Sequence, residues 1–283
     1  MRRLAVVAAL ALVGAGTAAT PPRGVPRGGF LVADRLGRLV VLDARGKPLR
    51  RLGKPLVQSS VQGLELAADR RHAFESVYRS DHPTRLYRVD LATGRRQLVD
   101  KGIGPALSPD KTRLAYVSTA VRNEIIYRTA LVLRELRGGP VRTIPLGPDV
   151  PVGTPPELVI NWSPDGRKIA VFDGSLVRLV DVANAQDVPS QPAIPGEPAL
   201  APVFLDGYTL VVLADCCIGH QHLVAVDLRS GARTAFARLS SPAETIRRLK
   251  PGLLLVTTAL NELALVSRGH VRVLTRGVTA AAG

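Results

Sequence analysis

The sequence of 283 residues repeats one short, mostly apolar pattern six times. Each copy ends in a polar residue, which is acidic in the first five copies and serine in the last. These end residues lie at positions 43, 90, 135, 181, 227 and 267, so that successive copies are 47, 45, 46, 46 and 40 residues apart. The copies are Leu39–Asp43, Leu86–Asp90, Leu131–Glu135, Val177–Asp181, Leu223–Asp227 and Leu263–Ser267. Near-constant spacing indicates one supersecondary unit repeated along the chain.

A second apolar segment precedes every copy, and a turn follows it. The turn contains glycine in five repeats and Asn184 in the fourth. Both residue types tolerate the positive φ that tight turns between paired strands require. The preceding segments are Phe30–Ala33, Ala73–Tyr78, Leu114–Ser118, Ile169–Phe172, Leu210–Ala214 and Leu253–Thr257. The pattern therefore predicts about four short strands per repeat and a nearly all-β body.

Four-stranded units at a period of about 40–45 residues are typical of a β-propeller. We therefore predict an all-β, six-bladed β-propeller of four-stranded blades over residues 20–283. The expected blades cover approximately residues 28–57, 61–102, 103–150, 155–198, 199–241 and 242–283. The first blade lacks a leading strand, so we expect either Gly277–Ala281 or the stretch before Phe30 to pair into it. Such closure would cover two strand edges that are otherwise prone to aggregation.

Two repeats share a turn sequence before their second strand. Proline presets φ at the second turn position, and Ser and Asp side chains bond nearby backbone groups. The turns are Ser108-Pro109-Asp110 and Ser163-Pro164-Asp165-Gly166. With the strands after them, these turns resemble the TolB-type, WD40-like propeller repeat, and the resemblance covers roughly residues 28–276. It implies an exported propeller that binds envelope proteins, here without the N-terminal α/β domain that TolB carries.

The N-terminal residues have the pattern of an export signal. Arg2 and Arg3 precede an uninterrupted apolar run, Leu4–Val13, and small residues then continue to Ala19. The run is too short to span a membrane as a helix, and signal peptidase reads small residues near its cleavage site. We predict a signal peptide over residues 1–19 with cleavage near Ala19 and export to the periplasm or the extracellular and cell-envelope space. No transmembrane segment is expected in the mature chain.

Positive charge is concentrated in the first half of the mature chain. The full sequence has 38 Lys and Arg against 23 Asp and Glu, a net charge of +15. Residues 20–142 hold 24 basic and 11 acidic residues, net +13, whereas residues 143–283 hold 12 of each, net zero. A field of one sign attracts anionic polymers or headgroups. Nucleic acid is not expected as a partner, because only 4% of the residues are aromatic and the chain carries an export pattern.

One short segment gathers potential metal ligands. It contains both cysteines of the chain, Cys216 and Cys217, together with His220 and His222. An exported protein matures under oxidising conditions, so a vicinal disulfide that stiffens the hairpin is the first interpretation. Thiolate and imidazole also suit zinc or copper, although adjacent cysteines place both sulfurs on one tetrahedral ion with difficulty. Buried free thiols and a metal site therefore stay open as the other two interpretations.

The acids that end the repeated strands are expected to bond backbone groups in the following turns. They are Asp43, Asp90, Glu135, Asp181 and Asp227, and the same interpretation holds for Asp110 and Asp165. A role that recurs with the repeat is structural, so we predict no catalytic residue among them.

These observations favour a non-catalytic, monomeric scaffold without a cofactor. We expect it to bind an envelope or extracellular protein, or an anionic cell-surface polymer or headgroup, through its loops, channel mouth and basic blades 1–3. One alternative is a lactonase- or lyase-like propeller enzyme with a metal at the channel mouth. The other is a metal-binding protein that uses the Cys216–His222 hairpin.

Overall fold

The computed structural model describes residues 24–56, 59–79, 82–122, 125–151, 160–172, 177–184, 186–188, 200–214 and 221–283. These residues form strands and turns and contain no helix, which confirms the predicted all-β body for this part of the chain. Accordingly, the described segments include no helix that could span a membrane. The predicted signal peptide, residues 1–19, lies outside the described residues.

The apolar segments of the repeat all lie in strands, as predicted. Of the polar residues that end the six copies, only Asp43 lies just after its strand. In chain order the strands are β1 (Phe30–Asp34), β2 (Leu39–Leu42), β3 (Pro48–Leu52), β4 (Ser59–Leu66), β5 (His72–Arg79), β6 (His82–Asp90), β7 (Arg96–Leu107), β8 (Arg113–Arg122), β9 (Ile125–Glu135), β10 (Val141–Pro151), β11 (Ile160–Trp162), β12 (Lys168–Phe172), β13 (Val177–Asp181), β14 (Gln186–Val188), β15 (Leu200–Phe204), β16 (Thr209–Ala214), β17 (Gln221–Asp227), β18 (Arg233–Leu239), β19 (Ala243–Lys250), β20 (Leu253–Thr258), β21 (Glu262–Ser267), β22 (His270–Arg276) and β23 (Val278–Ala282).

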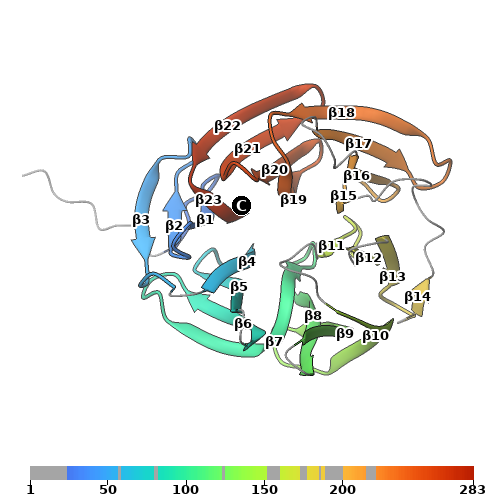
Figure 1. Ribbon diagram of the computed structural model, residues 1–283, viewed down its shortest axis with the longest axis horizontal. Coiled ribbons are helices and arrows are strands. Elements are labelled where there is room, and N and C mark those ends of the chain that lie inside the picture. Colours follow the sequence, from blue (N-terminus) through green and yellow to red (C-terminus); the bar gives the residue numbers. More distant parts are fainter. Residues whose placement is uncertain are drawn as a thin grey trace, which may run out of the picture.

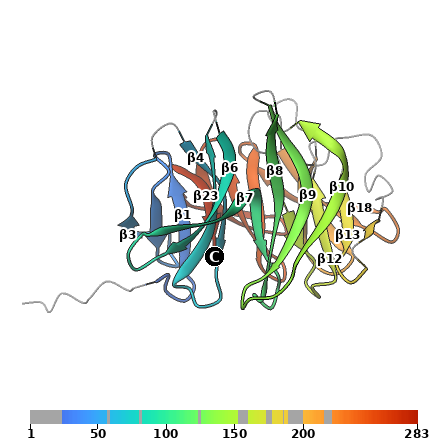
Figure 2. The same cartoon turned by 90° about the horizontal axis from the view of Figure 1, so that it is seen from below.

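The described strands form five antiparallel sheets that stand around a central axis (Figures 1 and 2). Four sheets have four strands each, in the orders β23-β1-β2-β3, β11-β12-β13-β14, β15-β16-β17-β18 and β19-β20-β21-β22. The fifth has seven strands in the order β10-β9-β8-β7-β6-β5-β4. Figure 1 shows β23, β4, β11, β15 and β19 near the axis and β3, β14, β18 and β22 at the outside.

The seven-stranded sheet differs from the separate units expected over residues 61–102 and 103–150. Its strand β7 has 12 residues, which is long enough to pair with two strands in succession. The part from Arg96 to Lys101 pairs with β6, and the part from Gly102 to Leu107 pairs with β8. A continuous strand thus crosses the expected boundary between residues 102 and 103.

The last strand closes the ring by pairing with the first. Leu31, Val32 and Ala33 of β1 lie opposite Ala282, Ala281 and Ala280 of β23. Of the two closing segments expected from the sequence, the C-terminal one is therefore used. The chain before β1 is held by Arg70 instead, whose guanidinium donates to the carbonyl oxygens of Val25, Pro26 and Gly29 at 3.0, 2.8 and 2.9 Å.

The core lies between neighbouring sheets. Consecutive residues of β8 point into two different apolar clusters, because side chains alternate across a strand. Leu114 and Tyr116 pack with Phe74 and Leu86 on one side. Ala115 and Val117 pack on the other side with residues that include Trp162 and Ile169. Burial on both faces explains why the second strand of each repeat is mostly apolar. The exception is β5, in which Glu75 and Ser76 are buried.

Candidate functional site

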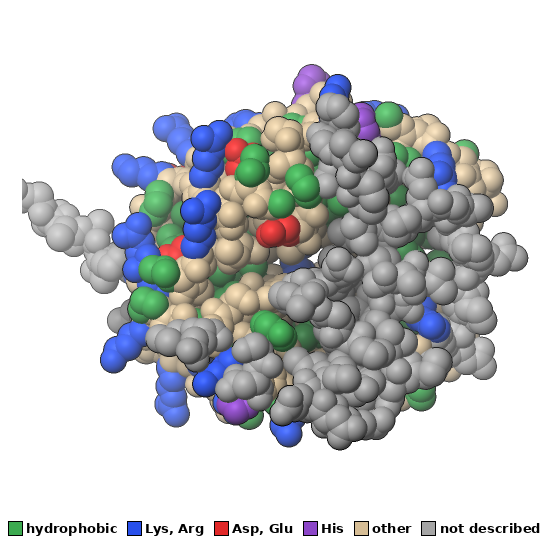
Figure 3. Space-filling model, viewed as in Figure 1, with side chains coloured by type: hydrophobic (Ala, Val, Ile, Leu, Met, Phe, Trp, Pro, Cys, Tyr) green, Lys and Arg blue, Asp and Glu red, His purple; other side chains and the backbone are tan. Residues whose placement is uncertain are grey.

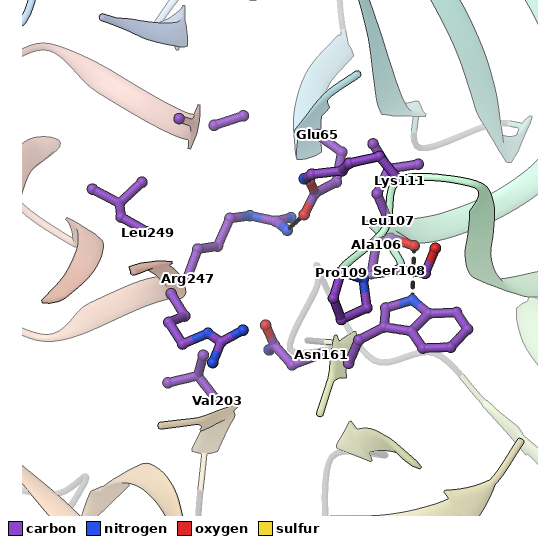
Figure 4. Close-up of a pocket in the computed structure, with 14 residues that line it drawn as sticks. Glu65, Ala106, Leu107, Ser108, Pro109, Lys111, Asn161, Val203, Arg247 and Leu249 are labelled. Atoms are coloured by element: carbon purple, nitrogen blue, oxygen red, sulfur yellow. Dashed lines mark hydrogen bonds and ion pairs between the residues drawn. The ribbon is translucent and has the colours of Figure 1, made fainter. Parts of the chain in front are cut away.

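Strands from every sheet end around one cavity on the axis, which has a volume of about 240 Å³ (Figure 4). We call this cavity the channel mouth. It is lined by residues of β4, β7, β11, β15, β19 and β23 and by the turn after β7. Glu65, Ala106, Asn161 and Val203 are each the second-to-last residue of their strands. The repeat thus brings one side chain from each of four strands to the same level of the cavity.

An ion pair crosses the channel mouth. Arg247 of β19 donates from Nη1 to Oε1 of Glu65 on β4, and the two side chains are both largely buried. The Nζ atom of Lys111 lies 3.9 Å from the other carboxylate oxygen of Glu65. Figure 4 shows Lys111 and Arg247 both pointing towards Glu65. One carboxylate therefore faces two cations from different sheets.

A third cation, Arg248, also lines the channel mouth. Its guanidinium Nη1 donates to the carbonyl oxygen of Leu205 over a long 3.5 Å. Burial lowers the pKa of Arg248 below its ordinary value, because desolvation penalises the charged form. Among the lining side chains, three cations thus accompany one carboxylate.

Polar side chains fix the wall opposite Arg247. Asn161, which is buried, donates from Nδ2 to the carbonyl oxygen of Pro202 at 2.7 Å. The indole Nε1 of Trp162 donates to the carbonyl oxygen of Ala106 at 3.1 Å, and the guanidinium of Arg113 covers its ring at 4.9 Å from the centroid. These bonds join neighbouring sheets and hold the wall of the cavity in one arrangement.

The predicted turn Ser108-Pro109-Asp110 borders the channel mouth. Ser108 Oγ accepts the backbone N–H of Arg113 at 2.9 Å and donates to Asp110 Oδ1 at 2.5 Å. Asp110 Oδ1 also accepts the N–H of Thr112 at 3.1 Å. These bonds, that from Ser108 above all, hold the pKa of Asp110 below its ordinary value. Ser108 and Pro109 line the cavity, so this structural turn is also part of the site.

The matching turn Ser163-Pro164-Asp165-Gly166 has the same bonds. Ser163 Oγ accepts the N–H of Lys168 at 2.8 Å and donates to Asp165 Oδ1 at 2.6 Å, which lowers the pKa of Asp165. The fourth turn residue has a positive φ in both turns, 70° at Gly166 and 59° at Lys111. Glycine adopts this conformation freely, whereas Lys111 is strained in it.

The recurring acids lie where the first of the two outer strands of each unit meets the following turn. The Oδ1 atom of each aspartate accepts two backbone N–H groups at 2.8–3.1 Å, in Asp43, Asp90, Asp181 and Asp227. The N–H of Lys47 is the largest cause of a lowered pKa of Asp43. In the described chain Glu135 makes no such bond, and its longer side chain lies instead against Gly139. None of these acids lines the channel mouth.

The cysteine–histidine segment is described only in part. Cys216, Cys217 and His220 lie outside the described residues, and His222 lies in β17 opposite Ala214 and Arg238. Among the described residues, no group of three or more His, Cys, Asp and Glu side chains could hold a metal ion.

The sequence pattern does not mark four of the charged lining residues as site residues: Glu65, Lys111, Arg247 and Arg248. The available signal was the equivalence of positions: residues just before the turns of successive repeats must meet at the axis of a ring. Reading those positions across repeats would have placed Glu65 and Asn161 together.

Comparisons with known proteins show the class of fold. No family model matches the sequence, and no curated protein matches it. TolB from Acinetobacter baumannii is similar in structure with a TM-score of 0.62 at 13% identity, over 90% of this chain and 65% of that chain. An oligogalacturonate lyase in complex with manganese has a TM-score of 0.54 at 15% identity, over 84% of this chain and 70% of that chain. The β-propeller domain of Cps50 (Swd1) from Myceliophteria thermophila has a TM-score of 0.51 at 14% identity, over 88% of this chain and 83% of that chain.

The fold is therefore a β-propeller of the TolB-like and WD40-like type, as the repeat turns predicted. Identities this low show the fold alone. Propellers host many unrelated functions, so function has to be argued from the site.

Proposed function

We propose that this chain is an exported, non-catalytic β-propeller that binds an envelope or extracellular protein or an anionic component of the cell envelope. In this proposal it has six four-stranded blades, and the seven-stranded sheet counts as two blades that share β7. It carries a cleavable signal peptide and acts as a monomer without a cofactor. The ligand contacts its loops, the channel mouth and blades 1–3.

An excess of exposed positive charge in the first half of the chain carries this proposal. Over the described residues up to 142, fourteen exposed Lys and Arg accompany three exposed acids, Asp69, Asp110 and Glu135. Beyond residue 142 the exposed described residues are eight basic and three acidic. Figure 3 shows Lys and Arg gathered along the edge that β3 and its neighbours form. The fourteen are Arg27, Arg35, Arg45, Lys47, Arg51, Lys54, Arg71, Arg79, Arg85, Arg88, Arg95, Lys101, Arg137 and Arg142.

A one-sided field of this kind raises the rate at which an anionic partner meets the protein and favours one orientation of approach. Arg247, Arg248 and Lys111 add positive charge at the channel mouth. The resemblance of the turns to the TolB-type repeat adds support, because that family is expected to bind envelope proteins.

A propeller enzyme is the second candidate, and the structural similarity to a manganese-containing lyase favours it. This candidate requires a metal at the channel mouth, but the charged side chains described there, one carboxylate and three cations, do not fit a divalent ion. Manganese that stays with the purified chain through dialysis, together with eliminative cleavage of an acidic polysaccharide, would favour this candidate over the scaffold.

Affinity capture from solubilised envelope with the mature chain tests the proposal. The first variant reverses three exposed charges of the basic half, Arg51→Glu, Arg85→Glu and Arg88→Glu. The matched control reverses three in the other half, Arg167→Glu, Arg268→Glu and Arg272→Glu. We expect capture to weaken with salt, because exposed charges are screened beyond about 8 Å at about 0.15 M ionic strength. The first variant should lose capture at low salt and the control should keep most of it. Capture that is insensitive to salt and to both variants contradicts the proposal.

A further inference from the structure

The side chains that line the channel mouth carry more positive than negative charge. Glu65 is shared by Arg247 and Lys111, which lie on either side of it. Arg248 enters the same cavity, and the carboxylate of Asp206 acts on it electrostatically without a direct ion pair among the described residues. A cation inside a cavity is costly unless it is paired or hydrogen-bonded. The lining side chains carry three positive charges against one negative charge, and this excess favours an anion in the cavity.

The guanidinium of Arg248 is open to such a group. It has five N–H donors in a fixed plane. In the described chain it gives one hydrogen bond, the 3.5 Å bond from Nη1 to the carbonyl oxygen of Leu205. Its side chain is half-buried at the cavity wall. Planar guanidinium groups with free donors bind carboxylate and phosphate oxygens in pairs.

The backbone of Lys111 is an independent observation. The equivalent residue of the next unit is Gly166, which suits the positive φ of this turn position. A lysine there costs about 1–2 kcal/mol relative to glycine. Strain of this kind is retained at functional sites when it places a side chain usefully. In this turn it accompanies an ammonium group at the channel mouth, 3.9 Å from Glu65.

We propose that the channel mouth binds a small ligand through an oxyanion, a carboxylate or a phosphate, and that Arg248 is the main contact and Lys111 the second. The cavity of about 240 Å³ equals the liquid volume of roughly eight waters at about 30 Å³ each, which suits a small organic acid or phosphate ester. The inference rests on the proposed binding role of the channel mouth and names the chemistry that this part of the surface selects.

Calorimetric titration of the purified mature chain with succinate and with inorganic phosphate tests the inference. Succinamide, which has the shape of succinate without its charge, is the ligand control. We expect a saturable signal with at least one anion and none with succinamide. The comparison of succinate with phosphate identifies which oxyanion the site prefers.

Three variants locate the site. Arg248→Gln should weaken binding by on the order of ten-fold or more, because it removes charged hydrogen-bond donors. Lys111→Gly should weaken binding less, and it should not impair folding because it installs the residue that Gly166 already provides. Lys250→Gln removes the same charge from the exposed end of β19, outside the cavity, and should leave binding unchanged.

Absence of a signal with both anions overturns the inference, as does equal weakening by Arg248→Gln and Lys250→Gln, which would indicate attraction to net charge only. The calorimetric titration and the envelope capture can fail independently of each other. A failed titration with successful capture refutes the small-ligand site alone, and a successful titration with failed capture refutes the envelope-binding role.

Discussion

Closure of the ring by β23 has a measurable consequence at Val278. This side chain is 3% exposed and packs in a cluster with Phe30, Val32 and Leu263, between the first sheet and the last. The substitution Val278→Ala removes two carbon atoms, worth about 1.6 kcal/mol at about 0.8 kcal/mol each. The cavity left behind adds to this loss, so we expect a total of about 2–3 kcal/mol in the free energy of unfolding.

The matched control is Val273→Ala in β22, a strand that precedes β23 directly. Val273 is 43% exposed and pairs with Ala264. Both substitutions replace valine by alanine in a strand, so they share any loss of β-propensity, which spans about 1 kcal/mol. The difference between the two variants therefore isolates burial at the closing strand.

Thermal unfolding followed by circular dichroism measures the difference. For a chain of this size about 1 kcal/mol lowers Tm by roughly 2–4 °C, so Val278→Ala should lower it by about 4–12 °C. The control should change Tm by roughly 2 °C or less. Urea midpoints should follow the same order with unchanged m values. Equal shifts in the two variants would refute the closure of the ring by β23.

Two further predictions concern buried polar groups. Glu75 is fully buried beside Arg96, and burial raises the pKa of its carboxyl above the ordinary 4.5, so the folded state holds this proton more tightly than the unfolded state. The raised pKa of Glu75 therefore stabilises the folded state fully below about pH 4.5, and this stabilisation is lost as pH rises through the folded pKa. Urea midpoints across this range should therefore fall with rising pH more steeply in the wild type than in Glu75→Gln, and equal slopes would contradict the assignment. Ser163→Ala leaves the N–H of Lys168 without its 2.8 Å acceptor at a position that is 1% exposed, and should cost about 1–3 kcal/mol by urea denaturation. Ser240→Ala at an exposed site should cost less than about 0.5 kcal/mol, and a similar loss in both would exclude a special role for the turn serine.

The sequence predicted the strands well because the same physical constraint acts on every repeat. A sheet packed on both faces favours a mostly apolar second strand, and segments such as Leu114–Ser118 and Leu210–Ala214 have that pattern. The boundary between the second and third units is harder to predict from the sequence. Whether β7 breaks into two strands depends on its pairing with β6 and β8 rather than on any turn residue, since the change of partner falls at Lys101 and Gly102.

The candidate site could not be derived from recurring residues. Asp43, Asp90, Asp181 and Asp227 attract notice because they repeat, and they repeat because each bonds the backbone of its own turn. Glu65 and Arg247 are 182 residues apart in the chain, and their ion pair depends on the ring being closed. Sequence separation of this size hides the pair from any local pattern.

A repeat protein builds an individual site from the positions where its repeats differ. The second-to-last residue of the inner strand is Glu65, Ala106, Asn161 and Val203 in four units, so one structural level carries an acid, a methyl group, an amide and an apolar side chain. The positive-φ turn position varies in the same way. It carries Arg70, which holds the N-terminal segment, Lys111, which faces the channel mouth, and Gly166. These positions share their backbone geometry but not their side chains. The recurring aspartates, in contrast, are fixed by the hydrogen bonds that they accept from the backbone of their own turns. The chemistry of this propeller is therefore to be sought at Glu65 and Lys111, where equivalent positions carry unlike residues, and at Arg247 and Arg248 beside them, rather than in the motif that identifies the fold.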